Sequence, residues 1–286
     1  MGLGPPAADV RFWGVRGSFP LSRPEARRYG TNTSSVSVHV AGEPLVLLDL
    51  GTGLPLLADG LSCQSAGRSP FTAAALVTHL HLDHIQGLPF FGPVHQEGAR
   101  IDVYAPRQPS DSLRAAVSRL VGPPLFPVEL DRLAADVVFH EVHEDVFALG
   151  GLRVTARPVP HLGPAVGYRI EGERFSMAYV SDHQQPADPS VVSTAVLELA
   201  DGVDLLVHEA QYTNAELATR PDWGHCTVDY ALHVARRCGA RALCLFHHDP
   251  RRDDSEIDGL LEGARRRAAG WDLDVVAARE GMTISL

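Results

Sequence analysis

The densest group of chemically active side chains is His79-Leu-His81-Leu-Asp83-His84, with three histidines and one aspartate in six residues. An apolar run at residues 73–78 comes directly before it and is expected to be a strand. His79 and His81 are two residues apart, so they point the same way in an extended chain. Imidazoles together with a carboxylate suit zinc, with manganese and iron as alternatives. The segment therefore predicts a metal site rather than a turn with surface histidines.

Three further donors, His161, Asp182 and His247, each follow an apolar run that is expected to be a strand. Taken singly, each is explained equally well as a surface or helix-capping residue. Ligands in open α/β sheets bind outside the carboxyl ends of the strands. The recurrence of donors at such positions therefore favours one shared site.

The composition limits the partners of this chain. Its 286 residues include 35 acidic residues against 25 basic ones, all arginine, for a formal net charge of −10. Phosphate-rich polymers are bound by basic side chains, so the charge argues against a long polyanion lying across the surface. The sequence has neither a long apolar run nor a secretory signal, so we expect a cytoplasmic protein without a membrane partner. The four cysteines lack CxxC spacing, and disulfides are not expected.

The elements that must position these donors alternate between short apolar runs and helical patterns. No repeat or linker interrupts them, which predicts one α/β domain over residues 1–286 with helices covering the sheets. Strands are expected at residues 10–15, 35–40, 45–50, 73–78, 137–143, 152–159, 166–171, 174–180, 203–208, 241–246 and 273–277. Helices are expected at residues 110–120, 189–199, 228–238 and 255–269, with Ser110 as a candidate N-cap and Gly239 as a C-cap.

The order of the donors, HxHxDH and then a single His, Asp and His, resembles the metallo-β-lactamase superfamily of dinuclear metallohydrolases. Asp49, in Leu-Leu-Asp-Leu-Gly-Thr-Gly, matches the first motif of that superfamily. The resemblance extends from residue 10 to about residue 250. It implies an αβ/βα four-layer sandwich, in which two mixed β-sheets pack back to back, helices lie outside, and the site lies at one edge.

The resemblance also implies two divalent metal ions, zinc first, with manganese or iron as alternatives. Asp49 would not bind a metal itself, but would orient the imidazole of a ligand by a hydrogen bond. The implied ligands are His79, His81 and His161 for one metal, Asp83, His84 and His247 for the other, and Asp182 bridging both together with a hydroxide.

Two segments indicate phosphodiester chemistry. Val207-His208-Glu209-Ala210, with Gly224-His225-Cys226-Thr227 sixteen residues further on, resembles the Glu–His pair of the ribonuclease Z-like branch. In that branch the histidine protonates the leaving oxygen and the glutamate orients the histidine. We therefore count His225 and Glu209 with Asp83 as catalytic candidates, although His225 could instead be a capping or surface residue. His81 favours hydrolysis, because the diiron redox branch usually has a glutamate at that position.

Residues 12–18 and 29–34 are rich in small residues and carry one arginine, a composition that suits the rim of an oxyanion site. This opening resembles the ribonuclease Z-like and cyclic-phosphate phosphodiesterase-like part of the superfamily, although two tight turns would explain it as well. The substrate-binding candidates here are Arg16, Ser18 and Asn32. The aromatic residues Tyr212, Trp223 and Phe91 either wall the pocket or belong to the core.

The substrate is expected to be a small phosphodiester, such as a cyclic nucleotide or a cyclic sugar phosphate. Members that process transfer RNA carry a long basic arm, whereas only residues 162–181 separate His161 from Asp182 here. Structured RNA is therefore not expected. A thioester or lactone hydrolase using the same metals, or a non-catalytic regulatory module that kept the fold, are the alternatives. Members of this branch are often dimers, which implies a homodimer.

Overall fold

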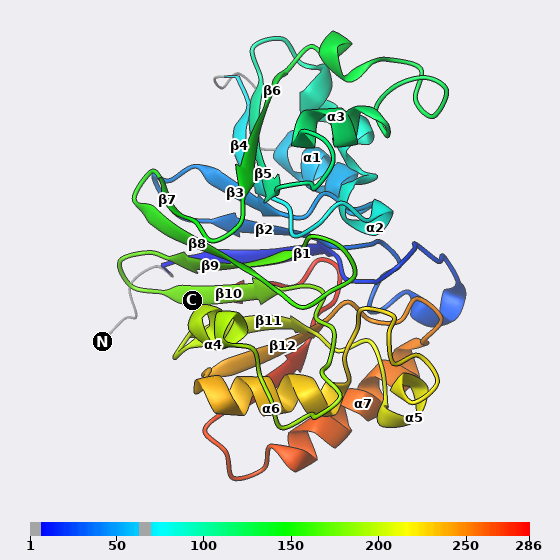
Figure 1. Ribbon diagram of the computed structural model, residues 1–286, viewed down its shortest axis with the longest axis vertical. Coiled ribbons are helices and arrows are strands. Elements are labelled where there is room, and N and C mark those ends of the chain that lie inside the picture. The colour runs from blue at the N-terminus through cyan, green and yellow to red at the C-terminus, as the bar shows by residue number, and fades with distance from the viewer. Residues whose placement is uncertain (1–6, 63–69) are drawn as a thin grey trace.

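The computed structural model describes residues 7–62 and 70–286, which form two β-sheets of seven strands each, packed face to face (Figure 1). In spatial order, the first sheet is β14 (Thr283–Ser285), β1 (Asp9–Gly14), β2 (Ser35–His39), β3 (Leu45–Leu48), β4 (Thr72–Leu76), β5 (Arg100–Pro106) and β6 (Asp136–Val142). The second sheet is β13 (Asp274–Ala277), β12 (Ala242–Phe246), β11 (Leu205–Glu209), β10 (Ser176–Val180), β9 (Val166–Glu171), β8 (Leu152–Pro158) and β7 (Val146–Leu149).

Each sheet is half parallel and half antiparallel. Strands β3 to β6 pair in parallel, and so do strands β10 to β13, whereas the remaining neighbours are antiparallel. The parallel strands β4, β11 and β12 are nearly continuous apolar runs because helices and the opposite sheet cover both of their faces. Of the donors that the sequence singles out, His161 follows the antiparallel strand β8, and the others follow the carboxyl ends of the parallel strands β4, β10 and β12.

The main core fills the space between the two sheets. Val36, Val38 and Leu76 of the first sheet pack with Tyr168 and Phe246 of the second, and all five side chains are buried. Burial of apolar surface of this kind is the main force that holds the two sheets together.

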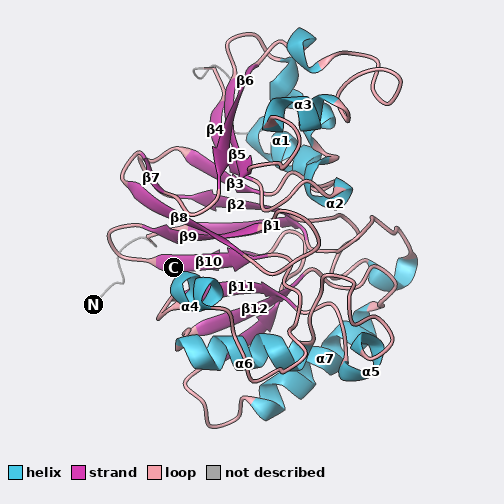
Figure 2. Cartoon of the chain, in the orientation of Figure 1, coloured by secondary structure: helices cyan, strands magenta, loops and turns pink. Residues whose placement is uncertain are grey.

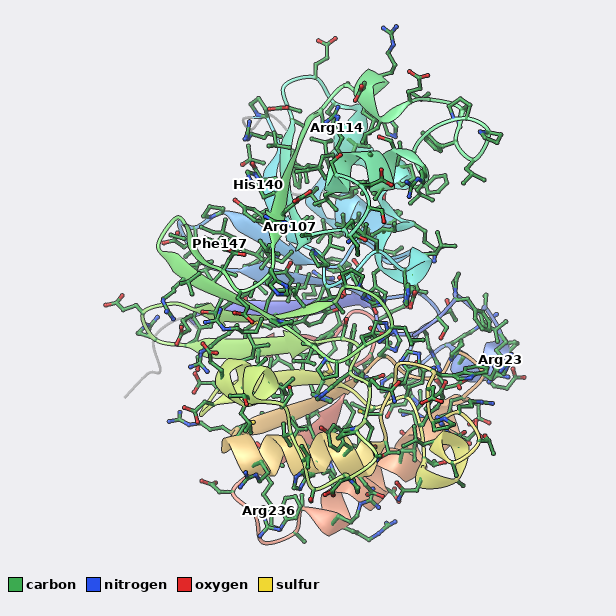
Figure 3. All side chains as sticks on the ribbon, in the orientation of Figure 1. Arg23, Arg107, Arg114, His140, Phe147 and Arg236 are labelled. Carbon is green, nitrogen blue, oxygen red and sulfur yellow. The ribbon has the colours of Figure 1, made fainter. Side chains whose placement is uncertain are left out.

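An aromatic stack also joins the sheets at the edge away from the donors. The Tyr104 ring lies between His140 and Phe147, with ring centroids 4.4 and 4.6 Å away. Figure 3 places the labelled His140 on β6 and Phe147 on β7. His140 is therefore part of the packing between the two sheets.

Helices cover the outer faces of both sheets (Figure 2). On the first sheet these are α1 (Leu54–Ser62) and α3 (Leu113–Ser118), and on the second they are α4 (Thr194–Ala200), α6 (Val228–Cys238) and α7 (Asp254–Arg267). Two short helices, α2 (Leu82–Ile85) and α5 (Asn214–Leu217), belong to the connecting loops. The expected four-layer αβ/βα sandwich of mixed sheets is confirmed.

Capping side chains set the helix boundaries, and they explain where prediction succeeds and fails. Helix α6 has the expected bounds, and Gly239 ends it in the left-handed conformation, with φ of 65°. The expected Ser110 cap is wrong, because Ser112 accepts the Ala115 N–H and α3 starts at Leu113. Ser193 likewise starts α4 five residues later than expected. Strands β5, β7 and β14 and helix α1 were not predicted.

The composition led to expectations about membrane-spanning segments and about disulfides. No helix in residues 7–62 or 70–286 has the length and apolar character needed to cross a membrane. Three of the cysteines, Cys226, Cys238 and Cys244, are free thiols, as expected. The fourth, Cys63, lies outside the described residues.

Candidate metal centre

The seven expected donors converge at the carboxyl ends of the strands, although they come from both sheets. From the first sheet, His79 and His81 follow β4, and Asp83 and His84 lie in α2. From the second sheet, His161 follows β8, Asp182 follows β10, and His247 follows β12. The edge where the two sheets meet therefore carries a single cluster of imidazoles and carboxylates.

Donor atoms within this cluster form overlapping groups. In each group, all donor atoms lie within 4.8 Å of one another, a spacing that one metal ion can span. The groups are His79, His81 and His161; His79, His84 and Asp182; Asp83, His84 and His247; and Asp182, His225 and His247. The first and third groups are the two ligand sets that the resemblance implies, and Asp182 lies beside both.

Unsatisfied buried atoms indicate what the cluster is built to hold. Nε2 of His79, Nε2 of His84 and Oδ2 of Asp182 are buried and have no hydrogen-bond partner among the described residues. His84 Nε2 is 3.2 Å from that Asp182 oxygen, and 3.1 Å from Oδ2 of Asp83. Buried polar atoms are rarely left unpaired, and coordination to a cation satisfies them. The donor set therefore fits divalent metal ions.

In His79, His84 and His161, ring nitrogen Nδ1 contacts a polar atom outside the donor set. Nδ1 of His84 is 2.8 Å from Oδ2 of Asp49, and Nδ1 of His161 is 2.8 Å from the Gly224 carbonyl oxygen. Nδ1 of His79 is 3.1 Å from Oγ1 of Thr78. Such contacts fix the orientation of an imidazole and leave its second nitrogen free to bind a metal.

Asp49 makes several of these supporting contacts, including the contact with an imidazole that was expected from the sequence. Its fully buried carboxylate also accepts hydrogen bonds from the Thr78 backbone N–H at 2.7 Å and from the Tyr179 hydroxyl at 2.9 Å. Thr78 and Tyr179 were not singled out from the sequence, and Gly224 was quoted only as part of the motif around His225. Thr78 offered a signal, because it is a polar residue at the end of an apolar strand and next to a donor.

Backbone strain is concentrated at the same place. Among the described residues, the non-glycine residues with positive φ are Ser18 at 59°, Asp49 at 59° and His247 at 55°. Ser18 donates its backbone N–H to Oδ2 of Asp83 at 2.7 Å. Conformations of this kind persist only where surrounding contacts enforce them, and they gather at functional sites. All three strained residues here support the donor cluster or belong to it.

The buried carboxylates and imidazoles of the cluster shift one another's pKa values. Burial alone would raise the pKa of Asp83, but the adjacent His84 and His247 imidazoles hold that pKa well below its usual value. Asp182 behaves in the same way, with His247 and His84 outweighing its burial and keeping its pKa well below the usual range. Burial and then the nearby His84 lower the pKa of His79 well below its ordinary value. Burial alone would lower the pKa of His84, but Asp83 and Asp49 raise it well above its ordinary value. The cluster thus presents ionised carboxylates, a neutral His79 and a His84 imidazole that shares its proton with those carboxylates.

Beside the donors lies the expected Glu–His pair. Nδ1 of His225 is 3.0 Å from Oε2 of Glu209 and 3.6 Å from Oδ1 of Asp182. Burial raises the pKa of Glu209 well above its usual value, and the nearby Asp182 charge raises it further. Burial also lowers the pKa of His225. A protonated His225 is therefore a stronger acid than a histidine in water.

Arg16 is one of three residues expected to contact substrate, and for Arg16 this prediction is wrong. Its guanidinium is buried, with 1% of the residue exposed, and it donates to the backbone carbonyls of Gly30 at 2.7 Å and Arg252 at 2.8 Å. Further carbonyls, of Asp249 and Ala26, accept from the same group. Arg16 is saturated by the backbone and is closed off from any substrate.

The other two lie nearer the cluster. Ser18 is exposed and touches Asp83 through its N–H. Asn32 is half-buried, and its backbone N–H donates to Oε1 of Glu280 at 2.5 Å, so its main chain supports this turn. No contact described for residues 7–62 and 70–286 joins the Asn32 side chain to the donors.

The three aromatic candidates have different environments. Phe91 is fully buried in the core beneath the first sheet. Tyr212 is buried with its ring edge-on to His225, at a centroid distance of 5.5 Å. Trp223 is 59% exposed. Only the last two lie in the loops around the Glu–His pair.

Fold and site together define a metallo-β-lactamase-fold metal-dependent hydrolase. Residues 46–248 match the family model described as "Beta-lactamase superfamily domain", and the chain belongs to this family.

Its relatives indicate the branch of the family. A ribonuclease Z of Brevibacillus brevis is 30% identical over 230 residues, covering 65% of this chain and 71% of that protein. The short form of human tRNase Z has the same fold, with a TM-score of 0.67, 23% identity, and coverage of 97% of this chain and 98% of that one. A diphosphatase from the PhnP family has a TM-score of 0.66 at 22% identity, with 98% of both chains covered.

Proposed function

We propose that the protein is a phosphodiesterase that uses two divalent metal ions, zinc first, to hydrolyse a small phosphodiester. The observation that carries this proposal is the contact of 3.0 Å between Glu209 and His225 beside the donor cluster. An alkoxide is a poor leaving group, and its departure needs a proton donor. A thioester or a lactone has a better leaving group and gains little from such a pair.

The proposed ligands are those implied by the resemblance. His79, His81 and His161 would hold one metal ion, Asp83, His84 and His247 would hold the other, and Asp182 would contact both. When bound, the metals would polarise the phosphoryl oxygen and supply a nucleophile from water at neutral pH.

The chain's own residues would orient the substrate and move the proton. Ser18 holds Asp83 through its N–H, and Asp49 holds the His84 ring, so the donors are fixed before substrate arrives. Glu209 fixes the His225 ring through Nδ1. Nε2 of His225 makes no hydrogen bond among the described residues and is the atom that would protonate the leaving oxygen.

A small substrate is favoured over structured RNA. The described chain passes from His161 to Asp182 through β9 and β10, an antiparallel pair without an inserted arm. The net charge of −10 disfavours a long polyanion outside the metal centre. The relatives named ribonuclease Z make RNA the second candidate.

The test is a substrate panel with the metal-loaded protein. It should contain 2′,3′- and 3′,5′-cyclic nucleotides, a cyclic sugar phosphate, a short RNA with a hairpin, and a thioester. We expect turnover of at least one small diester, abolished by Asp182→Ala and unchanged by substitution of the exposed His143 with glutamine. Turnover of the RNA alone would overturn the small-substrate proposal, and turnover of the thioester alone would overturn phosphodiester chemistry. A protein that binds no metal and hydrolyses nothing would instead be a regulatory module.

A further inference from the structure

The loop that carries His225 also carries an exposed indole. Trp223 lies two residues before His225 and is 59% exposed, although tryptophan is mostly buried in folded proteins. The exposed indole offers a planar face on which another ring can stack. The proposed reaction leaves this side chain without a role.

Trp223 is connected to His225 through an arginine and a second ring. Cζ of Arg220 lies 5.3 Å from the centre of the Trp223 ring and 5.4 Å from that of Tyr212. Tyr212 in turn packs edge-on against His225. Arg220 has a partner in Asp249, at 3.8 Å, which leaves the guanidinium in place beside both rings. Trp223 is exposed and Arg220 is half-buried, and the buried Tyr212 ring links Arg220 to His225.

The loop is held at several points. The Gln184 side chain donates to the Pro221 carbonyl at 2.6 Å and accepts the Gly224 N–H at 2.7 Å. The Gly224 carbonyl contacts Nδ1 of His161, a proposed metal ligand. The position of Trp223 is therefore tied to the donor cluster before any ligand binds, which reduces the entropy lost on binding.

We propose that Trp223 and Arg220 form a subsite that binds the base of a nucleoside phosphodiester on its leaving side. This inference rests on the proposed function, because His225 marks the side on which the leaving oxygen departs. An indole face stacks on a planar base, and a guanidinium beside it adds attraction for an electron-rich ring or a phosphate. A sugar without a base has no π-face to stack.

The reaction is an ordinary hydrolysis. The water oxygen bonds to phosphorus while the water gives up a proton to solvent, and the bond between phosphorus and the leaving oxygen breaks. The leaving oxygen takes a proton from His225, which regains one from solvent. In a linear diester the leaving oxygen belongs to a nucleoside that is released. In a cyclic nucleotide it stays on the same nucleoside as a free hydroxyl. The base lies on the leaving side in both cases.

Binding tests the subsite without any turnover. Adenosine 5′-monophosphate and ribose 5-phosphate carry the same phosphate and sugar and differ in the base. With metal-loaded protein, we expect calorimetry to show tighter binding of adenosine 5′-monophosphate. Trp223→Ala should weaken that binding about tenfold and leave ribose 5-phosphate unaffected, while Trp223→Phe should retain most of the affinity. Equal affinity of the wild-type protein for both ligands, or wild-type affinity in Trp223→Ala, would overturn the subsite.

Turnover gives a second, independent readout. The matched pair is 3′,5′-cyclic adenosine monophosphate and the same cyclic ribose phosphate without the base. Trp223→Ala should lower kcat/KM about tenfold for the nucleotide alone, and Arg220→Gln should act in the same direction. Loss on both substrates would mean that Trp223 supports the loop rather than the base.

The chain offers a matched control for the pair. Trp271 and Arg236 form a second Arg–Trp contact, at 4.6 Å, on α6 and the loop after α7. Trp271→Phe should change neither binding nor turnover, and circular dichroism should show that every variant is folded. If no diester is hydrolysed, the proposed function fails, and the calorimetric comparison still decides the subsite.

Discussion

Oε2 of Glu209 lies 3.0 Å from Nδ1 of His225, and the same oxygen is 3.8 Å from Nδ1 of His247. One buried carboxylate thus stands between the proposed proton donor and a proposed metal ligand. His225 also belongs to a donor group with Asp182 and His247. The first experiment must therefore separate proton donation from metal binding.

His225→Ala should lower the rate with an alkyl diester by about 10²- to 10⁴-fold, the usual contribution of a general acid. With a p-nitrophenyl diester the leaving group departs without help, so the loss should be less than about tenfold. Metal content, measured by atomic emission, should stay at the wild-type value. Equal losses on both diesters together with a lower metal content would make His225 a ligand instead.

Asp49→Asn should weaken zinc binding by about 10- to 100-fold, because the buried carboxylate orients His84 and accepts bonds from Thr78 and Tyr179. Competition with a chromophoric chelator measures the affinity. Asp204→Asn is a matched control, since Asp204 accepts the Ser176 N–H at the far end of the strands. Unchanged zinc affinity in Asp49→Asn would show that the site does not depend on this carboxylate.

Arg16→Ala should destabilise the fold by about 3 kcal/mol or more, because several buried carbonyls lose their donor together. Urea unfolding measures this change. Arg153→Ala provides the comparison, since Arg153 is exposed and its pairing with Glu171 should contribute less than about 1 kcal/mol. Similar effects for the two variants would contradict the structural role of Arg16.

Stability should fall in mild acid because of His208. Burial lowers the pKa of this fully buried imidazole to about 4. Below the ordinary value of about 6.5 the unfolded chain takes up a proton that the native state refuses, so stability drops as pH falls from 6.5 to 4. The contribution is about 3 kcal/mol over that range.

Urea unfolding of wild type and His208→Gln at pH 7, 6 and 5, with chelator present, measures this term. The free energies of unfolding should converge as the pH falls, because the variant lacks the titrating group. His143→Gln, at an exposed position, should parallel the wild type. A constant difference between wild type and His208→Gln would refute the assignment.

The sequence predicts well which side chains converge, because they are local or come at strand ends. Six residues hold four of the donors, and the remaining ones follow apolar runs that are easy to find. Helix α6 is bounded by Thr227, which accepts the Tyr230 N–H, and by Gly239, and both signals lie next to the helix.

The failures have a different cause. Arg16 donates to the carbonyls of residues 249 and 252, more than 230 positions away, as well as to those of Ala26 and Gly30. No pattern near Arg16 in the chain predicts these contacts. The roles of Tyr179 and Gln184 likewise depend on distant partners. The sequence favours the core over a pocket wall for Trp223, and the side chain is instead 59% exposed, because exposure follows from tertiary packing.

The donors come from both sheets, and this has a consequence for how the protein would tolerate change. Each proposed metal would join α2 or the end of β4 to a loop of the second sheet. It would therefore cross-link the two sheets. A substitution in the core between the sheets, at Leu76 or Tyr168 for example, would let one sheet slide against the other. Catalytic geometry would be lost before cooperative unfolding is seen. Enzyme activity would thus report the alignment of the two sheets more sensitively than any thermal melt.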